Sequence, residues 1–247
     1  NDYIINKEKK GFSIHALDRH ENIHIVKTTL EDKSTDSEIN IAQRIVRQFV
    51  KHPVKQIVAG FEQGKVISVK ALSDNQSEYF FIKHSTNQLP HCYNQKGEFL
   101  GYLFSRTPTH YTRISSPFNP KRLHPISKKV MPHKGVDLAA PINTPVWAAT
   151  EGIIDHISTD TGYGNLVIIK HPHGLTTYYA HLNKFHRQLK IGQKISAFET
   201  IGYVGSTGHS TGPHLHFETR VHNKPYDPLK INLPPPNIEK LVLHYYF

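Results

Sequence analysis

The sequence predicts a mainly β protein, with an antiparallel β-sheet domain in its C-terminal half and an α+β region before it. Residues 133–225 alternate short apolar runs with glycine-rich turns and contain no helical period. One amphipathic stretch, near residues 39–49, has the apolar spacing of a helix. A stretch rich in Pro, Ser and Arg, at residues 107–132, separates the two regions.

The N-terminal region contains one predicted helix, at about residues 37–52. Thr35 and Glu38 have the spacing of a capping box at its start, and the helix is expected to end near His52-Pro53. The apolar positions that give the helical period are Ile39, Ala42, Ile45, Val46 and Phe49.

Short β-rich runs broken by polar turns account for most of the remaining chain. They lie at residues 56–59, 65–72, 78–83, 99–104, 146–149, 152–157, 166–170, 176–180, 200–204 and 214–219. We therefore expect an α+β segment at 1–54, a β-rich accessory domain at 55–111, the C-terminal β domain at 112–233 and a tail at 234–247.

The composition narrows the classes of partner. The formal charge of +10 implies attraction to polyanions, but no run of five Lys or Arg accompanies it, so we expect no nucleic-acid partner. No apolar run reaches the length of a membrane span, so we expect no transmembrane segment. The single cysteine, Cys92, excludes an internal disulfide and a zinc ribbon.

Two His-x-His pairs occur, and their spacing alone does not distinguish them. With 19 His in 247 residues, chance gives about 1.5 such pairs. His171 and His173 flank a proline, which favours a strand end. His214 and His216 fall in an expected strand, where a period of two places both side chains on one face.

A His and an Asp four residues apart also occur twice, at His133 with Asp137 and at His156 with Asp160. Chance gives roughly 0.7 such matches. Imidazole and carboxylate are both zinc ligands. In a straight strand the first pair would lie about 13 Å apart, so the chain must bend for the two to share one ion, and Gly135 allows a bend.

Three longer stretches carry a resemblance to a known family. The sequences HKGVDLAAPINTPVWAATEGII, GYGNLVIIKHPHGLTTYYAHL and GYVGSTGHSTGPHLHFE resemble the consecutive signatures of LytM/lysostaphin-type zinc endopeptidases, which cut peptide cross-links of peptidoglycan. The resemblance covers about residues 112–232. It implies a LytM-type peptidase domain whose antiparallel sheet forms an open groove.

The resemblance also implies roles for five residues. His133, Asp137 and His216 correspond to the ligands of one zinc ion per chain. His181 and His214 correspond to the two histidines that act on the catalytic water. All five positions are filled, which favours an active zinc metalloendopeptidase over a non-catalytic envelope-binding or amidase-activating module.

One position departs from the family pattern. Asn143 stands where a glycine is common, and asparagine tolerates the left-handed conformation.

The upstream sequence RTPTHYTRISSPFNPKRLHPI is similar to the linker and first strand of Gram-negative, multi-domain members, and residues 56–106 resemble their LysM-like domain. The implied substrate is the D-Ala to diaminopimelate cross-link of peptidoglycan, with pentaglycine as the alternative. The implied location is the periplasm or cell envelope, with regulatory envelope proteins as further partners. The first residues, NDYIINKEKK, lack a signal-peptide layout, so we expect the export signal to be absent from this chain. The N-terminal region either covers the groove or is a passive scaffold.

Overall fold

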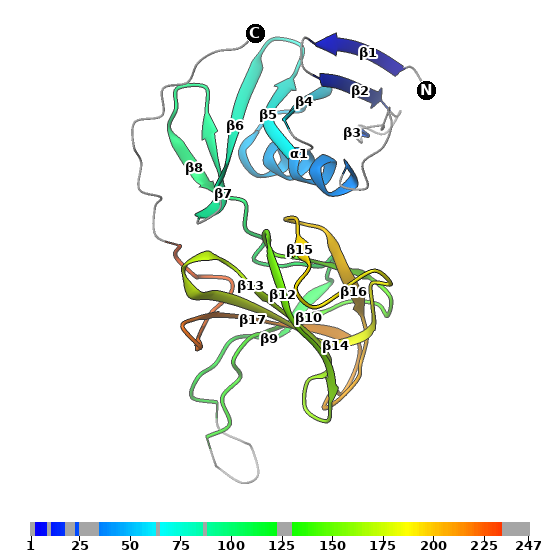
Figure 1. The fold of residues 1–247 in the computed structure, drawn as a ribbon, viewed down its shortest axis with the longest axis vertical. Helices are drawn as coiled ribbons and strands as arrows, with labels where there is room; N and C mark the ends of the chain where they lie inside the picture. Colours follow the sequence, from blue (N-terminus) through cyan, green and yellow to red (C-terminus); the bar gives the residue numbers. More distant parts are fainter. Residues whose placement is uncertain are drawn as a thin grey trace. The chain divides into compact units, whose positions relative to one another are not determined.

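The computed structural model describes residues 3–8, 11–17, 23–24, 35–62, 65–85, 88–122 and 130–233. The chain divides into two compact units at Phe104 (Figure 1). We call them the N-terminal unit, up to Leu103, and the C-terminal unit, Phe104–Leu233. The expected tail at 234–247 lies outside the described residues.

In its described residues, the N-terminal unit contains one helix and two antiparallel sheets. Strands β1 to β3 form the smaller sheet, and β4 to β8 form a five-stranded sheet in which each strand pairs with the next along the chain. The elements are β1 (Tyr3–Glu8), β2 (Gly11–Leu17), β3 (Ile23–His24), α1 (Thr35–Phe49), β4 (Gln56–Glu62), β5 (Lys65–Leu72), β6 (Ser77–Ser85), β7 (Gln88–Asn94) and β8 (Phe99–Tyr102).

Helix α1 packs its apolar face against β4 and β5. Ile41, Ala42, Ile45 and Val46 are all buried, as the helical period requires, and each buried Ile contributes roughly 1.5–3 kcal/mol. The helix ends at Phe49, earlier than the expected residue 52. Among the described residues, no helix has the length and apolar character of a membrane span.

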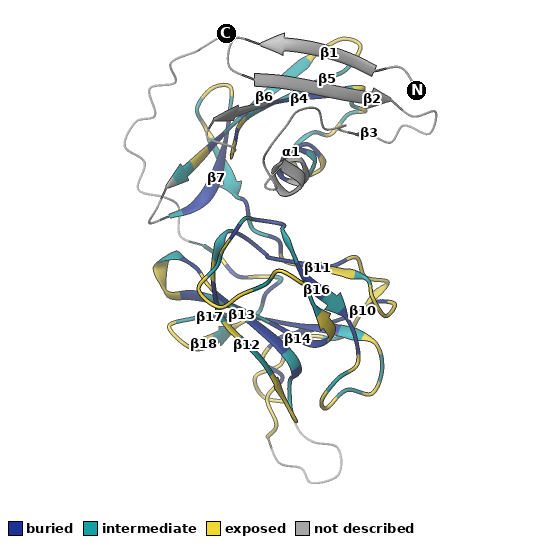
Figure 2. Cartoon of the chain, turned by 45° about the vertical axis from the view of Figure 1, so that its right-hand side comes forward, coloured by how far each residue is buried: buried dark blue, intermediate teal, exposed yellow. Residues whose placement is uncertain are grey.

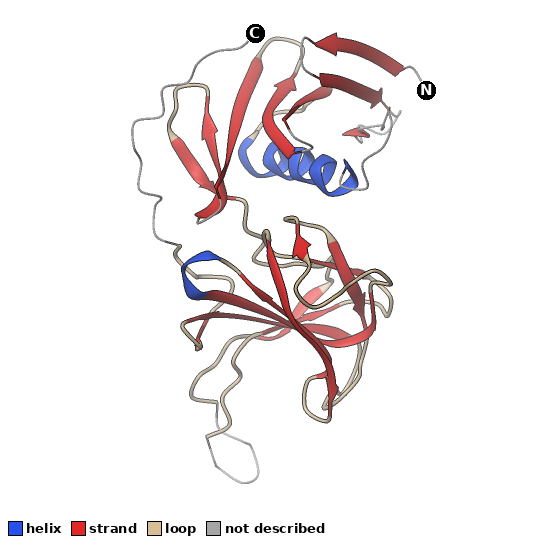
Figure 3. Ribbon diagram, viewed as in Figure 1, coloured by secondary structure: helices blue, strands red, loops and turns tan. Residues whose placement is uncertain are grey.

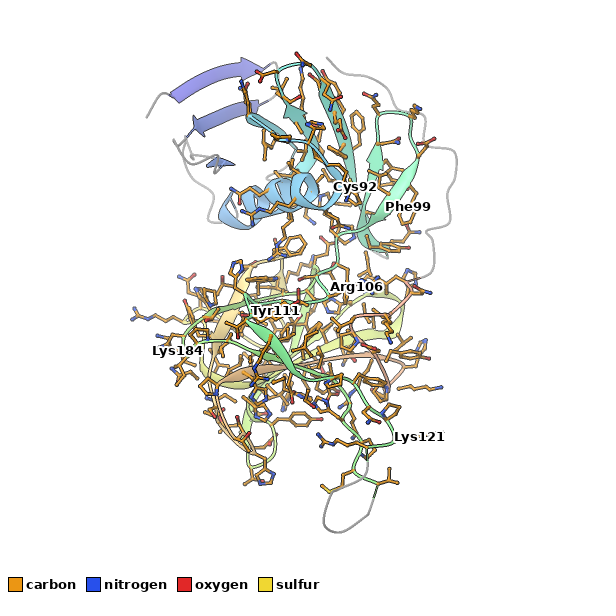
Figure 4. All side chains as sticks on the ribbon, turned by 180° about the vertical axis from the view of Figure 1, so that it is seen from behind. Cys92, Phe99, Arg106, Tyr111, Lys121 and Lys184 are labelled. Carbon is orange, nitrogen blue, oxygen red and sulfur yellow. The ribbon has the colours of Figure 1, made fainter. Side chains whose placement is uncertain are left out.

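Cys92 lies on β7 and is buried (Figure 4). Burial raises the pKa of its thiol to about 12, so the thiolate that nucleophilic chemistry requires does not form at neutral pH. The buried cysteine therefore acts as a small apolar residue of this sheet.

The C-terminal unit is built around one ten-stranded antiparallel sheet (Figure 3). The strand order is β15-β12-β13-β14-β17-β10-β9, with β16 joining β11 to β14 and with β18 beside β17. The strands are β9 (Arg113–Ser116), β10 (Val136–Ala139), β11 (Pro145–Trp147), β12 (Gly152–Asp160), β13 (Gly164–Lys170), β14 (Leu175–Phe185), β15 (Lys194–Ile195), β16 (Thr200–Val204), β17 (His214–Val221) and β18 (Lys224–Tyr226).

These strands confirm the predicted mainly β fold with an antiparallel C-terminal domain. The strand expected at 200–204 has those bounds, and the others expected after residue 145 overlap β11, β12, β13, β14 and β17. The expected domain boundary near residue 112 and the open groove stay predictions. Residues 104–111 already belong to the C-terminal unit and form hydrogen bonds within it. Ser105 N donates to Ala149 O, and Arg106 donates to Ile231 O.

The core of the C-terminal unit lies along the central strands of its sheet (Figure 2). Leu215 and Phe217 of β17 are fully buried in this core, together with Leu138 of β10 and Tyr179 of β14. Because side chains alternate along a strand, the residues between them point to the opposite face. That face of β10, β14 and β17 carries the candidate site.

Candidate metal centre and active site

Three neighbouring strands align the candidate residues in one row. Asp137 of β10 pairs with His216 of β17, and His216 pairs on its other side with Ala180 of β14. His214 stands two residues before His216, opposite Ala139. The alternation expected for β17 therefore places both of its histidines on the face that carries Asp137.

His133 reaches the same place from outside the strands. It precedes β10, and the chain bends at Gly135 between His133 and Asp137. A Cβ at Gly135 would lie 2.4 Å from the carbonyl oxygen of Phe217, so only glycine fits this close approach to β17. The bend that the His-x-x-x-Asp spacing requires is thus present.

His133, Asp137 and His216 form one tight cluster. Their candidate ligand atoms all lie within 4.8 Å of one another. His133 Nε2 is 3.0 Å from Asp137 Oδ1, His216 Nδ1 is 2.7 Å from the same oxygen, and the two ring nitrogens are 3.2 Å apart. Both histidines are buried, with exposed fractions of 6% and 7%.

The outer hydrogen bonds of the two rings determine which nitrogens face the cluster as acceptors. His133 Nδ1 lies 2.7 Å from the carbonyl oxygen of Pro117, and His216 Nε2 lies 3.0 Å from Glu218 Oε1. Neither oxygen can donate a proton, so both outer nitrogens carry one. When both rings are neutral, the lone pairs of His133 Nε2 and His216 Nδ1 converge on the Asp137 carboxylate oxygen. These acceptors repel one another, and a cation between them removes that repulsion.

A proton can provide the same positive charge, and the pKa directions agree with this. Burial alone raises the pKa of the Asp137 carboxyl, but hydrogen bonds and attraction to the two rings outweigh burial and hold it well below its usual range. Burial alone lowers the pKa of His216, but the hydrogen bonds to Asp137 and Glu218 raise it to about 9. The cluster therefore favours one bound positive charge, and a metal must displace a proton to bind.

His181 lies in a β-bulge within β14, four residues before the strand ends. The pairing of β13 with β14 shifts between Val167↔Tyr179 and Asn165↔Leu182, which gives β14 an extra residue. His181 has φ 59, a left-handed conformation that costs a non-glycine residue on the order of 1 kcal/mol or more. The bulge turns its ring toward the cluster, with centroids 5.8 Å from His216 and 4.8 Å from His214.

One loop, residues 205–213, orients both non-ligand histidines. His181 Nδ1 donates to Thr207 O at 2.8 Å, and His214 Nδ1 donates to Gly212 O at 2.8 Å. Each neutral ring therefore presents Nε2 as a proton acceptor, and His214 Nε2 lies 3.7 Å from Asp137 Oδ1. Burial lowers the pKa of His181 to about 4, so His181 is neutral at neutral pH.

The competing pairs lie in different surroundings. His171 is buried and has a partner for each ring nitrogen, whereas His173 is exposed on the turn Pro172–Gly174. His156 and Asp160 are both exposed on β12, and Asp160 Oδ1 accepts a turn hydrogen bond from Tyr163 N. Among the residues that the structure describes, only the His133 cluster brings together ligands for a metal.

Three residues behind His216 were not nominated from the sequence. Glu218, Arg220 and Tyr163 form a partly buried polar network that begins at His216 Nε2. Glu218 and Arg220 continue the alternation that places His214 and His216 on one face, so the period of two could have found them. Tyr163 comes from the turn between β12 and β13, which no local pattern connects to β17.

Several known proteins are similar in sequence to this chain. Residues 131–228 match the model of peptidase family M23. The chain is 37% identical over 180 residues to the peptidoglycan DD-endopeptidase ShyC of Vibrio cholerae, which covers 73% of this chain and 41% of that protein. It is 46% identical over 135 residues to the DD-carboxypeptidase/endopeptidase Mpg of Neisseria meningitidis, which covers 55% of this chain and 30% of that protein. The chain thus spans less than half the length of these relatives.

The fold is also similar to a solved structure. The crystal structure of a zinc-containing peptidase from Vibrio cholerae has a TM-score of 0.52 at 24% identity, with 90% of this chain and 79% of that chain covered. At this identity the match supports the fold alone. Residues 131–228 form a peptidase family M23 domain, as the motifs around His133, His181 and His214 predict.

Proposed function

We propose that this protein is a zinc-dependent endopeptidase that hydrolyses peptide cross-links of bacterial peptidoglycan. The observation that carries the proposal is the convergence of His133 Nε2, Asp137 Oδ1 and His216 Nδ1. When the two rings are neutral and the carboxyl is ionised, none of these three atoms carries a proton. Two imidazoles and one carboxylate match the donor set of catalytic zinc sites, which keep a further position open. Structural zinc sites instead close the shell with four protein ligands.

In this proposal His133, Asp137 and His216 hold the zinc ion. The ion would supply Lewis-acid chemistry, polarising the scissile carbonyl and making a water more acidic. His181 and His214 present acceptor Nε2 atoms beside the cluster, so they can take the proton of the attacking water. Once protonated, these rings can donate to the carbonyl oxygen or to the leaving nitrogen. The nucleophile is water, so no covalent acyl-enzyme forms.

The substrate proposed is the cross-link between D-Ala and a diaminopimelate side chain. ShyC and Mpg, named as DD-endopeptidase and DD-carboxypeptidase/endopeptidase, support this choice over pentaglycine. The formal charge of +10 favours attraction to the anionic polymers of the envelope. Peptidoglycan lies outside the cytoplasmic membrane, so the proposed place of action is the periplasm or cell envelope.

The roles of the other regions belong to the same proposal. Residues 55–111 would form a LysM-like or accessory domain, and regulatory envelope proteins would be further partners. The alternative function, a non-catalytic envelope-binding or amidase-activating module, has no need of the two acceptor histidines. Their common orientation toward the cluster supports the enzyme instead.

The decisive experiment is incubation of the full chain with purified muropeptides, read by mass spectrometry. D-Ala to diaminopimelate cross-linked dimers should become monomers, chelator should abolish the conversion, and added Zn²⁺ should restore it. Intact dimers in the presence of zinc would contradict the enzyme proposal. Faster cleavage of pentaglycine than of dimers would contradict the substrate proposal while leaving the chemistry intact.

A further inference from the structure

Glu218 is a buried carboxylate directly behind the candidate metal cluster. Only 1% of it is exposed, and it follows His216 by two residues on β17, so both side chains are on one face. Its Oε1 lies 3.0 Å from His216 Nε2, the ring nitrogen that faces away from Asp137. Glu218 is therefore next to the cluster without belonging to it.

We infer that Glu218 is the positioning residue of the metal centre, which fixes the tautomer of His216 so that Nδ1 is the metal ligand. The inference rests on the proposed zinc site. An ionised carboxylate can only accept hydrogen bonds, so His216 Nε2 must carry the proton. The lone pair of Nδ1 then faces Asp137 Oδ1 at 2.7 Å and His133 Nε2 at 3.2 Å.

The rest of the network keeps this carboxylate ionised and fixed in position. Arg220 Nε and Nη2 lie 2.7 Å and 2.6 Å from Glu218 Oε2, a two-point contact that balances the buried charge. The Tyr163 hydroxyl donates to Oε1 at 2.8 Å. Glu218 therefore has a donor for each oxygen besides His216, and its orientation does not depend on the histidine.

Arg220 is itself held from two sides. Its guanidinium carbon lies 3.9 Å from the ring centroid of Tyr178, and its Nη2 lies 3.1 Å from the Tyr163 hydroxyl. Tyr178 pairs with Glu218 across β14 and β17, so the sheet fixes the spacing of the network. A ring in the other tautomer would place Nε2 as an acceptor against a carboxylate, with two acceptors facing each other at 3.0 Å.

The conservative variant Glu218→Gln removes this control at constant size. A glutamine has one oxygen and one NH₂ group, so it opposes a donor with a donor at either His216 or Arg220. Loss of such an outer partner of a metal ligand typically lowers metal affinity about 10- to 100-fold. We expect a decrease of this size in the Zn²⁺ affinity of the full chain, measured by competition with a chromophoric chelator.

Glu199→Gln is the matched control. Glu199 is half-buried in the same unit and accepts a hydrogen bond from Ser196 N, away from the cluster. This variant should bind Zn²⁺ like the parent. A parent chain that does not bind Zn²⁺ would contradict the proposed function, whereas a folded Glu218→Gln chain with parental affinity would overturn the role of Glu218.

A second measurement needs no variant at Glu218. The ¹⁵N NMR signals of His216 in the parent chain, assigned through His216→Gln, report which ring nitrogen carries the proton. With zinc added, we expect a protonated Nε2 and a metal-bound Nδ1. Zinc on Nε2, with the proton on Nδ1, would overturn the inference even where Glu218→Gln fails to fold.

Discussion

Two buried polar clusters of the C-terminal unit, one around His171 and one at His133 and His216, differ in how their polar atoms are hydrogen-bonded. At His171, Nδ1 donates to Glu151 O at 2.7 Å and Nε2 accepts from the Thr177 hydroxyl at 2.8 Å. The Tyr179 hydroxyl continues the network, 2.9 Å from Thr177 Oγ1, and accepts from Ala149 N. At His133 and His216 the outer nitrogens have acceptors, while the inner atoms face one another.

The difference identifies the cluster that can bind a ligand. The histidines of both clusters are buried, but only the second cluster leaves converging acceptors that need a cation. A closed hydrogen-bond network stabilises the fold, because each buried polar atom has its partner. The cluster at His133 and His216 has acceptors without donors and therefore binds a positive charge.

The largest expected effect comes from removing any ligand of the cluster. His133→Ala, Asp137→Ala and His216→Ala should each lose most bound zinc and with it the endopeptidase activity, because three ligands are the minimum of a catalytic site. The measurement is zinc per chain by elemental analysis. His171→Ala, His156→Ala and Asp160→Ala are the controls, and equal zinc loss from these variants would refute the distinction between the clusters.

The next effect separates metal binding from proton transfer. His181→Ala and His214→Ala should keep zinc yet lose about 10² to 10⁴ in kcat, the usual contribution of a positioned acid or base. Hydrolysis of cross-linked dimers gives the rate, and elemental analysis gives the zinc content. A parental rate in either variant would show that its histidine has no part in the reaction.

The hydrogen-bonded cluster around His171 should make the stability of the C-terminal unit depend on pH. Burial lowers the pKa of His171 from 6.5 to about 4, so between these values the unfolded chain binds more protons than the folded one. The free energy of unfolding therefore falls as the pH decreases, by about 3 kcal/mol at pH 4. The only Trp, Trp147, lies in this unit and reports its denaturant unfolding by fluorescence.

His171→Gln should lower the free energy of unfolding at pH 7 and remove the part of its pH dependence that comes from His171. His173 is exposed, so His173→Gln should change neither the stability nor its pH dependence. An equally steep loss between pH 6.5 and 4 in His171→Gln would show that His171 is not the group responsible.

The smallest effect concerns the loop that orients His181. The Thr207 hydroxyl donates to Leu182 O and accepts from Asn165 N, both at 2.9 Å, which holds the Thr207 carbonyl against His181. Thr207→Val should lower kcat on the order of 10-fold with zinc content and KM unchanged, because a small displacement of the base is enough. Thr207→Ser keeps the hydroxyl and should retain the rate. Equal rates in the two variants would exclude this role.

The period-two alternation of β17 made much of the site predictable. It placed His214 and His216 on one face, and the same rule applied two and four residues further would have added Glu218 and Arg220. Gly135 gave the bend before Asp137. Asn143 has φ 69, the left-handed conformation that asparagine tolerates, and its Oδ1 accepts from Asn183 Nδ2.

Other features depend on contacts between distant segments. The orientation of His181 comes from a bulge and from Thr207 in another loop, and no local pattern encodes either. Apolar alternation did not predict β9, because Arg113–Ser116 is mostly exposed, and the strand forms by pairing with β10. β10 itself has only four residues, too few to give a periodic signal.

The most direct test of the central claim is a crystal structure of the zinc-loaded chain with anomalous diffraction recorded at the zinc edge. One anomalous peak should lie between His133 Nε2, the Asp137 carboxylate and His216 Nδ1, with His181 and His214 outside its coordination shell. A peak at His171 or His156, or zinc coordinated through His181 in place of His216, would contradict the account of converging acceptors as the metal centre.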